Sequence, residues 1–148
     1  MHRILPIFVW TVCGFAIAPS IFNSPLTAHQ QKTAPRNITA MIHLEPNDSP
    51  YARKPTLTWF MLTRTNGEMI APENCNCRVT AYDSSNRPIA QQLPLSTMQM
   101  EGHKKGHKAI RTTITFPKPG SYTVAFSGQA KDRSFNSFDL TFPVTVRP

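Results

Sequence analysis

The stretch IRTTITFPKPGSYTVAF, residues 110–126, decides the fold class. Every second residue is apolar or threonine over residues 110–116, and the alternation resumes over residues 122–126. Between them lies Pro-Lys-Pro-Gly, residues 117–120, which is typical of a turn. A period of two is typical of strands with one buried face. The stretch therefore predicts two antiparallel strands joined by a short turn.

The same pattern recurs along the rest of the chain. Short apolar or alternating segments are separated by Pro, Gly, Asn and Asp, and no segment has a sustained helical period. We expect strands over residues 38–44, 57–62, 77–82, 89–93, 110–116, 122–126 and 138–146. Fourteen prolines suit turns and strand edges and oppose helices. The sequence therefore predicts an all-β fold, an immunoglobulin-like seven-stranded antiparallel β-sandwich.

Residues 1–28 have the pattern of a secretory signal peptide. A short basic start precedes the apolar run Ile4–Ala18, and small residues end the segment. The alternative is an uncleaved membrane anchor, because the apolar part approaches the length that crosses a bilayer. Cleavage would leave an extended lead-in over residues 29–37 and one sandwich domain over residues 38–148. We expect the protein to be exported to a periplasmic, lumenal or secreted location.

The chain is basic, with sixteen Lys and Arg against eight Asp and Glu and a net charge of +8. Such an excess favours anionic surfaces, so we expect an acidic extracytoplasmic protein or a membrane surface as partner. We do not expect nucleic acid, because we expect the protein to be exported and no stretch resembles a nucleic-acid-binding module. Apart from Lys104, Lys105 and Lys108 the basic residues are dispersed, which also fits a solvated surface. We expect a monomer.

Cys75 and Cys77 are the two cysteines that follow the predicted cut. Cysteines outside the cytoplasm usually pair. We expect this short spacing to oppose an unstrained bridge, and any bond formed here to be labile. Two thiolates at this spacing could instead chelate Cu(I), and two buried thiols on the face of Val79 are a third state. The sequence leaves the three open.

The longest segment without a clear pattern covers residues 94–108 and holds Met98, Met100, His103 and His107. A loop of this length in a compact domain is usually functional or mobile. Thioether sulfur and imidazole together suit copper in both oxidation states. Neighbouring lysines repel a cation, and two glycines disfavour the helix on which a His-x-x-x-His pair would bind metal. A polar loop with incidental ligand types is therefore the alternative.

A second copper hypothesis depends on the cut after residue 28. His29 would then be the first mature residue, and its α-amino and ring nitrogens could bind one copper ion. His43, or a histidine of the 94–108 segment, could complete such a site. A solvated, frayed N-terminus is the alternative.

Three stretches carry a resemblance to known families: MIHLEP at 41–46, KPTLTW at 54–59 and FPKPGSYTV at 116–124. Through them the segment from Ile38 to Val146 resembles the YtkA-like domains of bacterial secreted proteins, and more distantly the CopC-like copper-resistance domains. Cys75-x-Cys77, with Pro72 before it, also looks like secreted cyanobacterial proteins of unassigned role. The resemblance implies a small immunoglobulin-like module near copper or membrane-protein assembly. CopC-like proteins bind Cu(II) through a mature N-terminal histidine, which His29 matches.

The sequence contains no Gly-x-Ser-x-Gly, His-Glu-x-x-His or Gly-rich phosphate loop, and its eight carboxylates are dispersed. We therefore expect a binding module and no enzyme. Our first functional hypothesis is a carrier that binds or delivers copper through the Met/His-rich loop. The second is a basic module that docks on an acidic protein or a membrane without metal.

Overall fold

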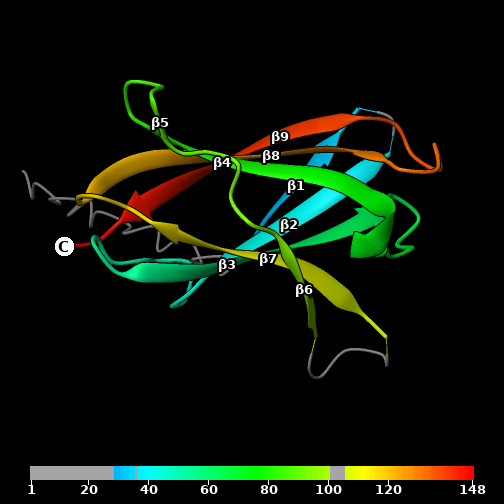
Figure 1. The fold of residues 1–148 in the computed structure, drawn as a ribbon, viewed down its shortest axis with the longest axis horizontal. Coiled ribbons are helices and arrows are strands. Elements are labelled where there is room, and N and C mark those ends of the chain that lie inside the picture. The colour runs from blue at the N-terminus through cyan, green and yellow to red at the C-terminus, as the bar shows by residue number, and fades with distance from the viewer. Residues whose placement is uncertain (1–28, 36, 101–105) are drawn as a thin grey trace, which may run out of the picture.

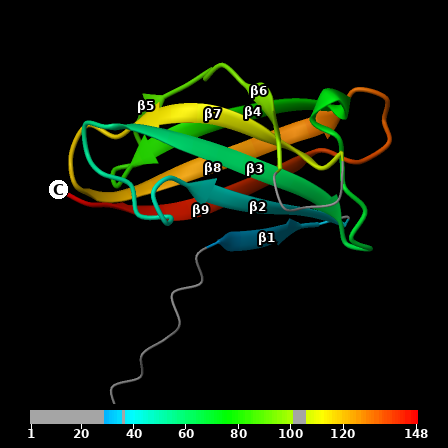
Figure 2. The ribbon, with the colours of Figure 1, turned by 90° about the horizontal axis from the view of Figure 1, so that it is seen from below.

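The computed structural model describes residues 29–148 except residues 36 and 101–105. In this part of the chain, nine strands form two antiparallel sheets that lie face to face (Figures 1 and 2). One sheet has the order β1-β2-β3-β7-β6 and the other the order β5-β4-β8-β9. The strands are β1 Gln30–Ala34, β2 Ile38–Leu44, β3 Pro55–Arg64, β4 Cys75–Asp83, β5 Pro88–Ala90, β6 Ser96–Gln99, β7 Lys108–Thr115, β8 Gly120–Ala130 and β9 Phe138–Val146. The predicted all-β class is confirmed.

The predicted number of seven strands is wrong, because the described residues form nine. The two additional strands are β1, inside the predicted lead-in, and β6, inside the segment predicted to be a long loop. Each lies at an edge of its sheet, where one strand neighbour is missing and most side chains face solvent. Edge strands need no apolar alternation, so neither shows the pattern that identifies the other strands. The predicted leader, residues 1–28, lies outside the described residues.

The core lies between the sheets and consists of the inward-facing residues of each strand. Phe60 of β3 stacks on Phe126 of β8 with ring centroids 4.2 Å apart, and Phe142 of β9 lies 6.3 Å from Phe60. All three side chains are fully buried. Burying a large apolar side chain stabilises a fold by about 1.5–3 kcal/mol, so this aromatic group is a main contact between the two layers.

Tyr122 fixes the turn between β7 and β8. It is buried, and its hydroxyl donates a hydrogen bond of 2.8 Å to the carbonyl oxygen of Lys118, four residues upstream. This is the contact of a corner tyrosine, in which a core side chain ties down the backbone of a neighbouring turn.

Helical structure is limited to one 3₁₀ turn over Pro72–Asn74 in the described residues. None of the segments described is a helix long and apolar enough to cross a membrane. The short turn leads directly into β4 at Cys75.

Candidate metal centre

Strand register places three rings in one row across β1, β2 and β3. Gln30 pairs with Ile42, so the preceding residue, His29, lies opposite His43. His43 in turn pairs with Trp59 of β3. The His29 and His43 rings are 4.7 Å apart between centroids, and those of His43 and Trp59 are 4.9 Å apart. The row lies on the outward face of the sheet, because the buried residues Ile42 and Leu44 flank His43 on the other face.

A tight turn after β2 brings a carboxylate to the same place. The backbone N–H of Asp48 donates to the carbonyl oxygen of Leu44, and Asp48 has a left-handed φ of 54°, which Asp tolerates better than most residues. Asp48 Oδ1 accepts a hydrogen bond of 2.7 Å from the backbone N–H of Leu44. The carboxylate is therefore held against the end of β2, beside His43.

Ligand-type atoms from three residues converge in this cluster of His29, His43 and Asp48. The two Nδ1 atoms of His29 and His43 are 3.0 Å apart. His29 Nδ1 lies 3.2 Å from Asp48 Oδ2, and His43 Nδ1 lies 3.0 Å from Asp48 Oδ1. Ring nitrogens and carboxylate oxygens are all electron-rich, so such a group is stable only with a proton or a cation among them.

These separations fit the coordination shell of a single metal ion. Two ligands held about 2.0–2.1 Å from one ion lie about 2.9 Å apart at a right angle and about 3.3 Å apart at the tetrahedral angle. The two histidine nitrogens are 3.0 Å apart, and each lies 3.0–3.2 Å from a different oxygen of Asp48, so each of these three separations lies between the two values. Imidazole nitrogen with carboxylate oxygen is a ligand set for Cu(II), Zn(II) or Ni(II).

Glu45 supports the cluster from outside. Its Oε1 lies 3.1 Å from Nε2 of His43, the ring nitrogen that faces away from His29. A carboxylate that accepts the Nε2 proton leaves Nδ1 as the lone-pair nitrogen, and metal-binding histidines commonly have such a partner. The contact orients His43 with its lone pair toward the centre of the cluster.

Exposure differs among the three ligands. The side chains of His43 and Asp48 are 13% and 11% exposed, whereas that of His29 is 42% exposed. Two ligands are therefore fixed in the body of the domain, and the third lies at the surface, at the start of β1. A bound ion would be held firmly from one side and open to solvent or to a partner from the other.

The Met/His-rich segment lies at the other edge of the same sheet. Met98 belongs to β6 and pairs with Ala109, and the backbone N–H of Met100 donates to the carbonyl oxygen of His107. His103 is outside the described residues. Since β1 and β6 are the two outer strands of a five-stranded sheet, about 19 Å separates them. The cluster at His29 is completed by His43 and not by His107.

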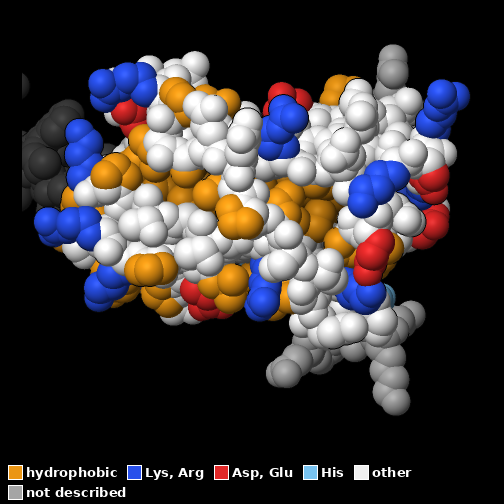
Figure 3. All heavy atoms as spheres, in the orientation of Figure 1, with side chains coloured by type: hydrophobic (Ala, Val, Ile, Leu, Met, Phe, Trp, Pro, Cys, Tyr) orange, Lys and Arg blue, Asp and Glu red, His pale blue; other side chains and the backbone are white. Residues whose placement is uncertain are grey.

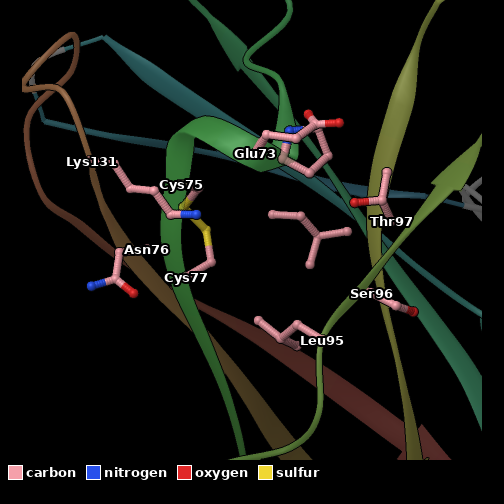
Figure 4. Close-up of a pocket in the computed structure, with 10 residues that line it drawn as sticks. Glu73, Cys75, Asn76, Cys77, Leu95, Ser96, Thr97 and Lys131 are labelled. Carbon is pink, nitrogen blue, oxygen red and sulfur yellow. A yellow bond between two sulfur atoms is a disulfide. The ribbon is translucent and has the colours of Figure 1, made fainter.

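Cys75 and Cys77 are joined by a disulfide at the start of β4 (Figure 4). Their Cα atoms are 5.2 Å apart, inside the ordinary range for disulfides, so the expectation that the backbone opposes this bond is wrong. In this state the two sulfurs are not thiolate ligands.

Asp48 and Glu45 are the site residues that sequence reasoning missed. Both lie in the turn that follows β2, the strand of His43. That position could have indicated them, because the residues of a tight turn lie close to the end of the preceding strand. The contact that matters depends on the left-handed backbone at Asp48, which composition does not reveal.

Comparison with known proteins supports the fold alone. The sequence matches no protein-family model, and it matches no curated protein. Among solved structures, the fold is similar to that of a DUF4426 family protein from Pseudomonas aeruginosa PAO1, with a TM-score of 0.55 and 9% identity over 80% of this chain and 97% of that chain. The resemblance to YtkA-like and CopC-like domains is not confirmed by these comparisons.

Proposed function

We propose that this protein is an exported, non-enzymatic copper-binding module. Its mature form begins at His29 and binds one Cu(II) ion through the α-amino nitrogen and Nδ1 of His29, Nδ1 of His43 and a carboxylate oxygen of Asp48. The observation that carries this proposal is the convergence of His29, His43 and Asp48, whose ligand atoms, one from each residue, all lie within 4.8 Å of one another. One of the three residues, His29, is the histidine that the predicted cut would make N-terminal.

The identity of the metal follows from the ligands. Nδ1 of an N-terminal histidine and its α-amine belong to one residue, so both can bind the same ion. Together with His43 they supply three nitrogens, and nitrogen-rich, tetragonal sites favour Cu(II). Cu(II) also binds such sites more tightly than the other divalent ions of its row. The CopC-like resemblance, which implies Cu(II) binding at a mature N-terminal histidine, supports the same choice.

Exposure of His29 supports a role in carrying the ion. His43 and Asp48 keep their positions through the sheet and the turn, while His29 is 42% exposed. An acceptor protein could therefore approach the ion from the His29 side and replace ligands one at a time. We expect the module to take up copper outside the cytoplasm and to release it to such an acceptor.

The alternative, a basic module that docks without metal, has less support. On the face shown in Figure 3, Lys and Arg side chains are scattered and acidic side chains lie between them. Docking on an anionic surface by charge requires basic side chains gathered on one face. The dispersion seen there favours a solvated surface.

Copper titration of two variants, each with one histidine replaced by alanine, tests the proposal. The full chain is expressed for export, purified, and its N-terminus is determined by mass spectrometry. Cu(II) affinity is then measured by competition with a chelator for the unchanged protein, for His43→Ala and for His107→Ala. We expect one equivalent of Cu(II), a loss of at least about tenfold, or about 1.4 kcal/mol, for His43→Ala, and no change for His107→Ala. The opposite order of the two variants would assign copper to the Met/His-rich loop and overturn the proposal.

A further inference from the structure

The Cys75–Cys77 disulfide lies on the inward face of β4, at an end of the strand that is only partly covered. Cys75 is 6% exposed, whereas Cys77 is half-buried. Directly opposite Cys77 on β8 is Gly128. A Cβ atom at Gly128 would lie 2.8 Å from the sulfur of Cys75 and 2.9 Å from that of Cys77. Because glycine has no Cβ atom, position 128 leaves room for both sulfurs.

The disulfide opens onto a hollow at the side of the sandwich, between β4 and β6 (Figure 4). Leu95, Ser96 and Thr97 line it on one side, and Cys75, Asn76 and Cys77 on the other. Hydrophobic side chains are visible across the middle of the surface in Figure 3. A second hollow, lined in part by Gly128, also reaches Cys77. Cys77 is thus the sulfur that can be approached from outside.

Strand β4 has a free edge beside the disulfide. Its neighbour β5 pairs with it only at Ala81 and Tyr82. In the part of the chain that the structure describes, no strand pairs with the stretch from Cys75 to Thr80 on that side. Unpaired N–H and C=O groups on a strand edge are a template for an extended segment of another chain.

Lys131 lies at the same hollow and points toward the disulfide in Figure 4. A nearby ammonium group stabilises a thiolate. The sulfur that leaves during thiol–disulfide exchange carries that negative charge, and better stabilisation of the leaving thiolate speeds the exchange. Cys75 is the more buried of the two cysteines and lines the same hollow as Lys131, so it is suited to leave, and the more exposed Cys77 is suited to be attacked.

We propose that this disulfide is a reactive centre that oxidises a pair of cysteines in an extended polypeptide segment bound along the free edge of β4. A substrate thiolate attacks Sγ of Cys77; the Cys75–Cys77 bond breaks, and Cys75 leaves as a thiolate that takes up a proton. The second substrate thiolate then attacks the mixed disulfide, so the substrate gains a disulfide and Cys77 leaves as a thiolate. The substrate loses two electrons and two protons, and the Cys75–Cys77 pair gains both.

Strand pairing gives the geometry that the first step needs. A residue directly opposite another in an antiparallel pair has its Cα about 4.5–5.5 Å away, with both side chains on the same face. This separation lies within the range that a disulfide spans. A substrate cysteine that pairs opposite Cys77 would therefore be placed to form the mixed disulfide, whereas a small thiol would have no such placement.

The activity is independent of the proposed copper site. The disulfide belongs to the β5-β4-β8-β9 sheet, and His29, His43 and Asp48 belong to the other sheet and to its connecting turn. The two proposals share no residue, and exchange is measured in buffer that contains a chelator and no copper.

Exchange is tested with the full chain, expressed for export and purified in its oxidised state. It is mixed with a reduced synthetic peptide that has two cysteines among valines and threonines, and samples are quenched with acid, alkylated and analysed by mass spectrometry. We expect the peptide to lose two hydrogens and the protein to gain two. A peptide with a single cysteine can form only the mixed disulfide. We expect this peptide to be attached to Cys77 and the alkyl group to be on Cys75.

Two references show whether the folded site matters. The first replaces the protein by the oxidised peptide of residues 72–80, which has the same disulfide without the fold. The second keeps the protein and replaces the dithiol peptide by glutathione. We expect the protein to oxidise the dithiol peptide at least about tenfold faster than the 72–80 peptide does, because binding positions the thiol. We also expect Lys131→Gln to slow exchange and Lys118→Gln, a lysine in the β7–β8 turn, to leave it unchanged.

Equal rates for the protein and the 72–80 peptide would overturn the proposal, as would glutathione reacting as fast as the dithiol peptide. The proposal would also be overturned if the adduct were found on Cys75. The same holds if the purified chain contained two thiols that no oxidant converts to a disulfide. None of these outcomes changes the copper titration, so failure of this proposal is distinguishable from failure of the metal site.

Discussion

The imidazole of His43 packs beside the indole of Trp59 across strands β2 and β3, with ring centroids 4.9 Å apart and an angle of 36° between the rings. The ring of His29 lies 4.7 Å from that of His43 and 6.0 Å from that of Trp59 between centroids, so the three rings form a triangle. The chain has two tryptophans, and Trp10 lies in the predicted leader. In a domain that begins at His29, which is the mature domain of our proposal, Trp59 is the single tryptophan and an optical probe at the candidate metal centre.

We expect Cu(II) to quench the fluorescence of Trp59 in the mature domain, with an end point at one equivalent. A paramagnetic ion bound to His43 would be close enough to the indole to quench it. Zn(II), which has a filled d shell and no redox chemistry, should bind at the same atoms without comparable quenching. In His43→Ala the quenching by one equivalent should disappear. Quenching that persists in this variant would show that copper binds elsewhere.

The aromatic contact between the two sheets predicts the effect of a core substitution. Phe60 is fully buried on Phe126, so Phe60→Ala should lower the free energy of unfolding by about 3–5 kcal/mol. Leu57 lies on the outward, half-buried face of the same strand, and Leu57→Ala is the matched control with a much smaller loss. Urea denaturation measures both. Equal losses would contradict the difference in burial between Phe60 and Leu57.

The space beside Gly128 predicts the behaviour of the disulfide. In Gly128→Ala the new methyl group would lie under 3.0 Å from both sulfurs and 3.1 Å from the ring of Phe138, so the bridge must shift. Two separate thiols can rotate away from the methyl group more easily than a closed disulfide can. We therefore expect Gly128→Ala to be reduced at a lower ratio of reduced to oxidised glutathione than the unchanged protein.

Ser127→Ala, at the neighbouring position of β8, is the control for that experiment. Its side chain points to the opposite face of the strand, so the oxidised fraction should follow that of the unchanged protein. An unchanged oxidised fraction in Gly128→Ala would contradict the close approach of Gly128 to the two sulfurs.

The turn between β4 and β5 predicts a dependence of stability on acid. The pKa of Asp83 is lowered from its ordinary value of 3.8, chiefly because its carboxylate accepts a hydrogen bond from the backbone N–H of Arg87, and also through the Arg87 side chain. Because the pKa is lower in the folded state, Asp83 stabilises the fold above pH 3.8, and this contribution is lost as the pH falls through the folded pKa.

Urea midpoints measured from neutral pH down to strong acid test this dependence. Asp83→Asn should be less stable than the unchanged protein at neutral pH, and the difference should shrink as the pH falls below 3.8. A difference that stays constant over the whole range would contradict the role of the Asp83 charge. An NMR titration of the Asp83 carboxyl gives the folded pKa independently.

The sequence identified the strands that face the core, because their burial alternates. β9 begins at Phe138 and ends at Val146, as the alternation of its apolar residues predicts, and its burial alternates at every residue. β1 could not be predicted in the same way, since Gln31 to Thr33 are exposed on both sides of an edge strand. The strands of the β5-β4-β8-β9 sheet and the inner strands of the other sheet were therefore predictable, whereas the polar edge strands β1 and β6 were not.

The candidate metal centre was only half predictable. His29 was identified from the expected cut and His43 was named as a partner, but their contact depends on the β1–β2 register, which the polar residues of β1 do not specify. Asp48 reaches the cluster through a turn that returns to Leu44. The Met/His-rich segment, in contrast, attracted attention by composition alone, and β6 places it at the far edge of the sheet.

The most direct test of the copper site is the effect of one added residue on Cu(II) affinity. The domain that begins at His29 is compared with the same domain bearing one glycine before His29, both prepared by site-specific proteolysis. The added glycine keeps every side chain but moves the α-amine away from the imidazole of His29. We predict that Cu(II) affinity falls at least about tenfold in the extended domain, which is about 1.4 kcal/mol. Equal affinities would contradict the account, because the N-terminal amine would then not be a ligand.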